Sequence, residues 1–419
     1  MFSSRLPDDL SENRLSRRVR ELRAEGVELL DLTLSNPTRA GLTYPEEEIR
    51  EAFARASALP YDPQPRGLAV TREAIAAGSG ALQRADGFRG SERRPFIDPA
   101  HLHCTSSSSE AYSMLFKLLC DPGDEICIPL PAYPLFAWLA GLDAVRVRPY
   151  NLRLAPDGHW HIDMHSLDMA ISDRTRAVIV VNPSNPAANY LRPDEFLQLD
   201  SLCARNRIAL ITDEVFWDFP LIDFSAGAAG IEAAPVSRES ENVVTRQRTV
   251  GIPGEALRFT INGLSKLLAL PQMKLGWILT EGPASLRDDA LARLDVIADS
   301  YLSVSTPVMA AAPALLGFRE NIQSQIRTRC LRNLETARAL FGDARSGLTL
   351  LPPEGGWSAL LRLPDAADEE VIALRLLEQE RVLVHPGYLF DFARGKFLVV
   401  SLLSPEEGFA EGTRRLHSG

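Results

Sequence analysis

Short apolar runs alternate with helical patterns through the middle of the chain. The apolar runs predict strands at 125–129, 145–147, 177–181, 208–212 and 277–279. Between them, the spacing of apolar residues predicts helices, notably over 109–119 and 193–206. Strands that alternate with helices form βαβ units, so the pattern predicts an α/β fold with a mostly parallel sheet. In such sheets the binding sites lie at the carboxyl ends of the strands.

The two ends of the chain carry different patterns. Leu15, Val19 and Leu22 share one face of a predicted N-terminal helix. After about Tyr301, long helical patterns come first and strands near 358–361 and 397–402 follow. This order predicts a second, smaller α+β domain in the C-terminal part.

The length of the chain supports a division into domains. A chain of 419 residues is too long for one simple core. We expect an N-terminal segment over 1–45 that joins the small domain, a large domain over 46–300 and a small domain over 301–419.

Composition and charge narrow the class of protein. The 45% hydrophobic and 24% charged residues are ordinary for a globular protein, and the net charge of -10 argues against a nucleic-acid surface. The five cysteines have no C-x-x-C spacing, which favours free thiols in a reducing compartment. The seven histidines have no metal-ligand spacing, so no metal site is predicted. A charged N-terminus and the lack of any run of about 18 apolar residues indicate a soluble, cytoplasmic protein without a membrane partner.

One lysine stands in a segment of small and apolar residues. The run 262–266 ends in Ser265 and Lys266, and a second lysine, Lys274, follows. A lysine in such a place can form a Schiff base with an aldehyde cofactor. Most Ser-Lys pairs are surface turns, so this segment alone leaves both interpretations open.

A serine-rich segment, Thr105–Ala111, leads directly into a predicted helix. Its free backbone N–H groups and the helix dipole suit a phosphate, and a plain helix N-cap is the alternative. Asp213 comes directly after the strand predicted at 208–212, where a carboxylate can keep a ring nitrogen protonated or simply cap a helix. Asn185 and Tyr133 also follow predicted strands. The amide of Asn185 could donate to a phenolate or carboxylate oxygen, and the ring of Tyr133 could stack; a plain turn and a core tyrosine are the alternatives.

In this order and spacing, the segments resemble the class I/II aminotransferases, the aspartate aminotransferase-like members of the fold-type-I pyridoxal-phosphate enzymes. The resemblance runs from about Asp31 to Leu403, and it includes Leu34–Thr38 and the turn Tyr61–Gly67. It implies a large domain with a mostly parallel seven-stranded sheet flanked by helices. It also implies a smaller α+β domain and bound pyridoxal 5'-phosphate.

The resemblance implies a role for each matching residue. Lys266 would be the catalytic residue that forms the Schiff base, and Asp213 would hold the protonated ring nitrogen. The other cofactor contacts would be Asn185 at the ring oxygen, Tyr133 against the ring, and Ser108, Ser109, Ser265 and Lys274 at the phosphate. Tyr61 would reach the phosphate of a neighbouring subunit, which implies a homodimer.

Three positions depart from the family's pattern. Phe216 stands where a tyrosine usually donates to the ring oxygen, so we expect a raised pKa of the Schiff base. Lys274 stands where an arginine usually grips the phosphate, and it offers a point charge instead of a bidentate fork. Val399 stands where an arginine usually binds the substrate carboxylate.

The missing arginine leaves the substrate contacts open. Asn36, Asn185 and Arg39 are the candidates for substrate binding, and Arg394 and Lys396 are alternatives near the last strand. A dicarboxylic substrate would need a second arginine for its second carboxylate, and the sequence offers no dedicated one. A small or apolar amino acid is therefore expected as substrate.

The resemblance implies an aminotransferase that moves an amino group between an amino acid and a 2-oxo acid. Lys266 would remove the Cα proton and return it to the cofactor. A carbon–sulfur β-lyase, or another enzyme of the same fold that removes the Cα proton, is one alternative. A non-catalytic sensor is another, but no basic helix-turn-helix segment is visible in the sequence.

Overall fold

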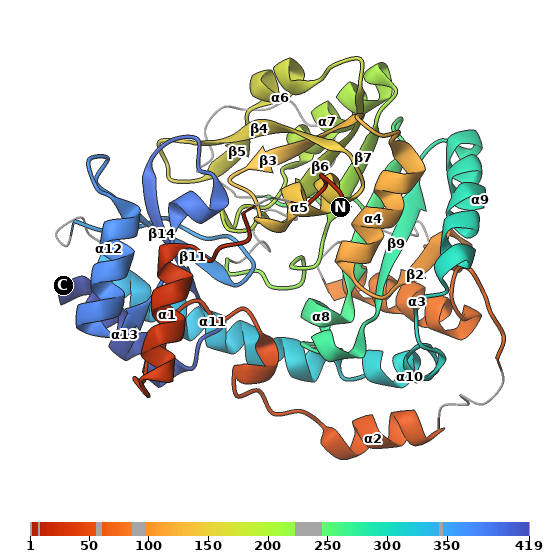
Figure 1. The fold of residues 1–419 in the computed structure, drawn as a ribbon. Coiled ribbons are helices and arrows are strands. Elements are labelled where there is room, and N and C mark those ends of the chain that lie inside the picture. The colour runs from red at the N-terminus through yellow and green to blue at the C-terminus, as the bar shows by residue number, and fades with distance from the viewer. Residues whose placement is uncertain are drawn as a thin grey trace, which may run out of the picture.

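The structure is a computed structural model, and it describes residues 2–6, 9–55, 61–85, 97–222, 245–342 and 347–418. Figure 1 shows a large sheet between helices and, beside it, a smaller unit formed by the C-terminal part. The N-terminal helix α1 (Arg14–Ala24) lies against α12 (Glu369–Arg375) of that part. None of the helices in the described ranges is both long and apolar enough to span a membrane.

The large sheet has eight described strands. In spatial order they are β2 (Leu102–Thr105), β9 (Gly276–Glu281), β8 (Arg258–Gly263), β7 (Ala209–Asp213), β6 (Thr175–Val181), β3 (Glu125–Leu130), β4 (Arg146–Leu154) and β5 (Trp160–Ile162). Five neighbouring strands from β8 to β4 run parallel, whereas β9 and β5 run against their neighbours. The predicted α/β fold is confirmed. The sheet exceeds the seven expected strands because the short β5 folds back on β4, where Ile162 pairs with Leu152.

Helices cover both faces of this sheet because its strands are apolar on both sides. In β6, Ala177 and Ile179 pack toward one face, and Val178 and Val180 pack toward the other. The first face is covered by α4 (Ser108–Leu119), α5 (Leu135–Leu142) and α9 (Ala284–Tyr301). The second face is covered by α6 (Met164–Ala170) and α7 (Pro193–Asn206).

A further layer lies at the β2 edge of the large sheet. Its helices are α2 (Glu46–Arg55), α3 (Ala69–Ala85), α8 (Leu264–Leu267) and α10 (Thr306–Leu316). Buried Ile75, Leu102, Leu267 and Ala312 belong to one apolar cluster, which fastens these helices to the edge strands.

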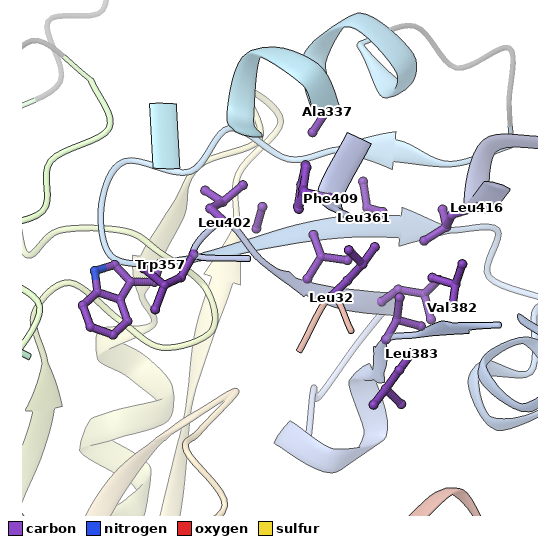
Figure 2. Close-up of a cluster of buried hydrophobic side chains, with 14 of the residues drawn as sticks. Leu32, Ala337, Trp357, Leu361, Val382, Leu383, Leu402, Phe409 and Leu416 are labelled. Atoms are coloured by element: carbon purple, nitrogen blue, oxygen red, sulfur yellow. The ribbon is translucent and has the colours of Figure 1, made fainter. Parts of the chain in front are cut away.

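The C-terminal part has its own core. Its four-stranded sheet has the order β10 (Thr349–Leu350), β11 (Ser358–Leu363), β14 (Lys396–Ser401) and β13 (His385–Pro386). Its helices besides α12 are α11 (Arg319–Phe341) and α13 (Glu406–Ser418). The N-terminal strand β1 (Leu30–Asp31) pairs in parallel with β12 (Val382–Leu383). Figure 2 shows that Leu32, from the N-terminal segment, packs with Val382, Leu402 and Phe409 in this core.

Candidate active site

The strand ends of the large sheet bring the polar segments together. Asp213, the last residue of β7, is in register with Val181, the last residue of β6. On the other side of β7, the ends of β8 and β2 and the start of β9 are aligned, since Gly263 and Thr105 both pair with Gly276. The segments that follow β2, β6, β7 and β8 therefore leave the sheet at one edge.

Lys266 lies in α8, directly after β8. Its Nζ donates to the carbonyl oxygen of Ser35 at 3.5 Å. The same atom lies 5.1 Å from the ring centroid of Trp357 and 5.5 Å from that of Phe216. Burial lowers the pKa of Lys266, and the charge of Asp213 opposes this shift. The amine therefore releases its proton more readily than that of a solvated lysine.

Asp213 is buried at the end of β7. Burial raises its pKa to about 6, while hydrogen bonds and the charge of Lys266 act in the opposite direction. The backbone N–H of Val215 donates to Oδ1 at 3.1 Å, and Tyr112 Oη donates to Oδ2 at 3.0 Å. Tyr112 was not among the predicted site residues. Its only signal in the sequence is its place on α4, one turn after Ser108.

The serine-rich segment forms the start of α4, as both interpretations of it require. Ser107 caps the helix, because its Oγ accepts from the N–H of Glu110 at 3.1 Å. The N–H groups of Ser108 and Ser109 have no acceptor within the described ranges, which is the usual state of a first helical turn. These two N–H groups and the helix dipole can receive an anion.

Lys274 and Ser265 belong to the segments next to this helix start. Gly276 packs tightly there, since a Cβ atom on it would lie 3.1 Å from Thr105 Oγ1 and 3.2 Å from the carbonyl carbon of Ser107. Lys274 is exposed, two residues before Gly276. Ser265 is half-buried beside Lys266.

Asn185 lies in the segment that follows β6. The start of this segment is bonded to the neighbouring strand β7, because the N–H of Asn182 donates to the carbonyl oxygen of Asp213 at 2.8 Å. Asn185 Oδ1 accepts from Ser358 Oγ at 3.3 Å, which leaves its amide nitrogen available as a donor. Tyr133, after β3, is 46% exposed, and its ring meets Phe136 edge-on.

Two of the predicted substrate residues, Asn36 and Arg39, lie in the segment that follows Ser35, whose carbonyl oxygen accepts from Lys266 Nζ. Asn36 Oδ1 accepts from the N–H and hydroxyl of Thr38, so it caps the short 3-10 helix Pro37–Arg39. Arg39 is exposed, and no partner for it lies in the described part of the chain. Tyr61 is 79% exposed, and no hydrogen bond within the described chain orients its hydroxyl.

The position of the missing arginine is apolar. Val399 is buried in β14 between Leu360 and His385, its two cross-strand partners. Ser358, which follows Trp357, pairs with Ser401 at the end of the same two strands. Ser401 Oγ donates to the carbonyl oxygen of Leu34 at 2.6 Å. Neutral hydroxyl groups therefore stand on this side of the site.

Trp357 and Ser358 were not predicted as site residues. The signal that precedes them is the glycine pair Gly355–Gly356. A Cβ atom on Gly355 would lie 2.4 Å from the ring of Tyr190, so only glycine fits this close approach. No group of side chains suited to hold a metal ion occurs in the ranges that the structure describes.

Comparisons of the whole sequence show which known proteins this chain is similar to. A family model described as Aminotransferase class I and II matches residues 27–407. An alanine aminotransferase of Mycobacterium tuberculosis (strain ATCC 25618 / H37Rv) is 26% identical over 422 residues, covering 99% of this chain and 91% of the relative. A glutamate-pyruvate aminotransferase AlaA of Haemophilus influenzae is 23% identical over 388 residues, covering 91% of this chain and 88% of the relative.

Solved structures share the fold over its full length. An alanine aminotransferase from Pyrococcus furiosus has a TM-score of 0.83 at 21% identity, covering 100% of this chain and 99% of that chain. An aspartate aminotransferase mutant of Thermus thermophilus has a TM-score of 0.76 at 23% identity with the same coverage. The resemblance stated from the sequence is confirmed. The chain belongs to the class I and II aminotransferases, a family of transferase enzymes that use pyridoxal phosphate.

Proposed function

We propose that this aminotransferase uses pyridoxal 5'-phosphate and moves an amino group between a small amino acid and a 2-oxo acid, with alanine and pyruvate as one substrate pair. The family match supports the class of reaction, and relatives named for alanine, glutamate and pyruvate support the substrates. The observation that carries the proposal is the electrostatic interaction between the amine of Lys266 and the buried carboxylate of Asp213, which stand at the ends of the neighbouring strands β8 and β7.

The residues present fit this cofactor chemically. An aldehyde needs an amine, a ring nitrogen needs an anion, and a phosphate needs several N–H donors. Lys266 supplies the amine, Asp213 the anion and the first turn of α4 the donors. We assign the remaining cofactor contacts to Asn185, Tyr133, Ser108, Ser109, Ser265, Lys274 and, from a neighbouring subunit, Tyr61.

Lys266 is assigned the proton transfer. When bound, pyridoxal phosphate supplies an aldehyde that bonds to amines and a ring that draws electrons from the substrate Cα. Because burial lowers its pKa, a larger fraction of the Lys266 amine is neutral near neutral pH than for a solvated lysine. A neutral amine can take the Cα proton as a general base and return it as a general acid.

Asp213 is assigned to the ring nitrogen. A carboxylate in a site shielded from water favours a proton on a nearby nitrogen more strongly than it would in water. The N–H of Val215 and the hydroxyl of Tyr112 stabilise the ionised carboxylate and fix its orientation. Without these donors, burial would favour the neutral carboxylic acid, which cannot attract a proton.

We assign substrate binding to neutral groups and one arginine. We propose that Asn36, Asn185 and Arg39 bind it, since the buried Val399 offers no charge. The rings of Phe216 and Trp357 near Lys266 form an apolar wall. Such a wall suits a methyl group better than a second carboxylate, because burying an unpaired charge is costly.

We also propose how the chain is organised. The exposed ring of Tyr61 suits a contact with a second copy of the chain in a homodimer. The segment 1–45 and residues 301–419 would form the small domain, and 46–300 the large domain, in keeping with the core that Leu32 shares with Phe409. The five free cysteines of the chain suit a reducing, cytoplasmic location.

The proposed reaction can be tested with labelled nitrogen. Purified protein loaded with pyridoxal phosphate is incubated with ¹⁵N-alanine and 2-oxoglutarate. We expect the label in glutamate, with one pyruvate formed for each glutamate. Absence of transfer from alanine to any 2-oxo acid would contradict the proposal. Pyruvate released from cysteine without an acceptor acid would instead indicate a β-lyase.

A further inference from the structure

A buried ionic cluster surrounds Glu354, three residues before Trp357. The side chain of Glu354 is 1% exposed. Its Oε1 lies 2.7 Å from His159 Nδ1, and its Oε2 accepts from Arg192 Nη1 at 2.9 Å and from the N–H of Tyr190 at 2.8 Å. Arg192 also bonds to Oε1, so the pair is bidentate. Every oxygen of this buried carboxylate is therefore engaged by the segments around β5 and α7.

The backbone next to Glu354 is fastened to the same region. The N–H groups of Glu354 and Gly355 donate to the carbonyl oxygen of Ala188 at 2.9 and 3.0 Å. The N–H of Gly356 donates to Phe219 at 2.9 Å. These bonds join a C-terminal segment to two loops of the large sheet.

The segment held in this way carries one wall of the site. Trp357 lies 5.1 Å from Lys266 Nζ, and Ser358 Oγ lies 3.3 Å from Asn185 Oδ1. Trp357 also meets Phe216 edge-on, with ring centroids 5.2 Å apart. In Figure 2 its ring lies at one end of the C-terminal core, away from most of the cluster.

We propose that Glu354 is a positioning residue for the reaction, and that its carboxylate, clamped by Arg192 and His159, keeps Trp357 and Ser358 against Lys266 and Asn185. The inference rests on the proposed function of this site. Glu354 touches neither Lys266 nor Asn185, so it acts only through the segment that follows it.

The chemistry of the cluster predicts what loss of the Glu354 carboxylate would do. A buried ion pair contributes little net stability, because both charges lose their hydration, yet removal of one partner leaves the other charge uncompensated. In Glu354→Gln the guanidinium of Arg192, whose side chain is 10% exposed, would lose its counter-charge. The segment would then relax, and Trp357 would no longer be held at one distance from Lys266.

The test compares Glu354→Gln with a matched variant, Asp200→Asn. Asp200 is also buried, pairs with Arg258 and accepts from backbone N–H groups, but Arg258 begins β8 whereas Lys266 follows its other end. Both variants remove one buried negative charge. Only the first removes a charge next to the wall of the site.

Two measurements separate positioning from a purely structural role. In cofactor-free protein, the pH midpoint of acylation at Lys266, read by mass spectrometry, should rise by about one unit in Glu354→Gln as water reaches the amine. In loaded protein, kcat/KM for the amino donor should fall about 10- to 100-fold, the usual effect of a small misplacement. Asp200→Asn should leave both quantities unchanged.

Two outcomes overturn the proposal. One is a Glu354→Gln protein that folds and keeps both the wild-type midpoint and the wild-type kcat/KM. The other is an equal change in Asp200→Asn. If Glu354→Gln does not fold, the same two measurements are made on His159→Gln. This variant removes one contact to the Glu354 carboxylate at a half-buried position, and wild-type values in it would overturn the proposal. A wild-type protein that transfers no amino group refutes the proposed function, whereas the acylation midpoint still tests the role of Glu354.

Discussion

Tyr112 Oη lies 3.0 Å from Asp213 Oδ2, and both side chains are buried between α4 and the end of β7. The hydroxyl group donates to the carboxylate and lowers its pKa, against a burial that raises it to about 6. The tyrosine therefore increases the ionised fraction of Asp213.

Replacing this tyrosine should weaken cofactor binding. Tyr112→Phe removes a hydrogen bond to a charged acceptor, worth about 1.5–3 kcal/mol, so we expect the Kd for pyridoxal phosphate to rise about tenfold or more. Calorimetric titration of cofactor-free protein measures it. Tyr150→Phe is the control, because Tyr150 is equally buried and donates to the carbonyl oxygen of Ile179 at 2.8 Å, a contact that does not involve Asp213. An unchanged Kd in Tyr112→Phe would contradict this role.

The stability of the cofactor-free protein should depend on pH through Asp213. Its folded pKa of about 6 lies above the ordinary value of 3.8, so its contribution to stability is full below pH 3.8 and is lost as the pH rises through 6. Asp213→Asn has no carboxylate to ionise, so it avoids the loss of stability that wild type suffers as the pH rises. We expect it to be more stable than wild type at pH 8, by up to about 3 kcal/mol in urea denaturation. The difference should vanish near pH 4, and a variant that is less stable than wild type at pH 8 would refute the assignment.

A hydroxyl restored at position 216 should change the titration of the bound cofactor. The Phe216 ring lies 5.5 Å from Lys266 Nζ and carries no donor. In Phe216→Tyr, a donor to the ring oxygen would stabilise the deprotonated form, so the pKa of the covalent lysine–cofactor bond should fall by about one unit. Absorbance recorded against pH measures this pKa. Phe392→Tyr, at a half-buried ring beside Trp160, serves as the control. No downward shift in Phe216→Tyr would sink the prediction.

Arg39 should affect substrate binding more than turnover. Arg39→Gln removes an exposed charge that has no partner within the described chain, so the fold should be unaffected. Loss of a charge-assisted bond of about 1.5 kcal/mol should raise KM for both the amino acid and the 2-oxo acid about tenfold. Steady-state kinetics of Arg39→Gln and of the surface control Arg20→Gln provide the comparison. Equal KM values in both variants would exclude Arg39 from the site.

Two strands whose bounds could be predicted closely are those that packing makes uniformly apolar. The runs 177–181 and 208–212 were recognised because β6 and β7 are buried on both faces. Strand β8, which leads to Lys266, was not predicted. It alternates apolar residues with the buried polar residues Arg258, Thr260 and Asn262, which are satisfied by distant partners such as Asp200, Thr249 and the carbonyl of Glu214.

The site could be predicted only where a short segment carries its own chemistry. Asp213 ends β7 and Lys266 follows β8, both were named from the sequence, and the structure places their segments at one edge of the sheet. Tyr112, Trp357 and Glu354 were missed because their importance comes from contacts with residues far along the chain. A helix face or a glycine pair does not reveal such contacts in one sequence.

The central claim is that Lys266 Nζ bonds the cofactor, and it can be tested directly. Protein loaded with pyridoxal phosphate is reduced with borohydride, which makes the bond permanent, and is then digested for mass spectrometry. We predict the mass of the reduced cofactor on Lys266 and its disappearance in Lys266→Ala. A label on Lys274 or another lysine, or no label in wild-type protein, would contradict the account.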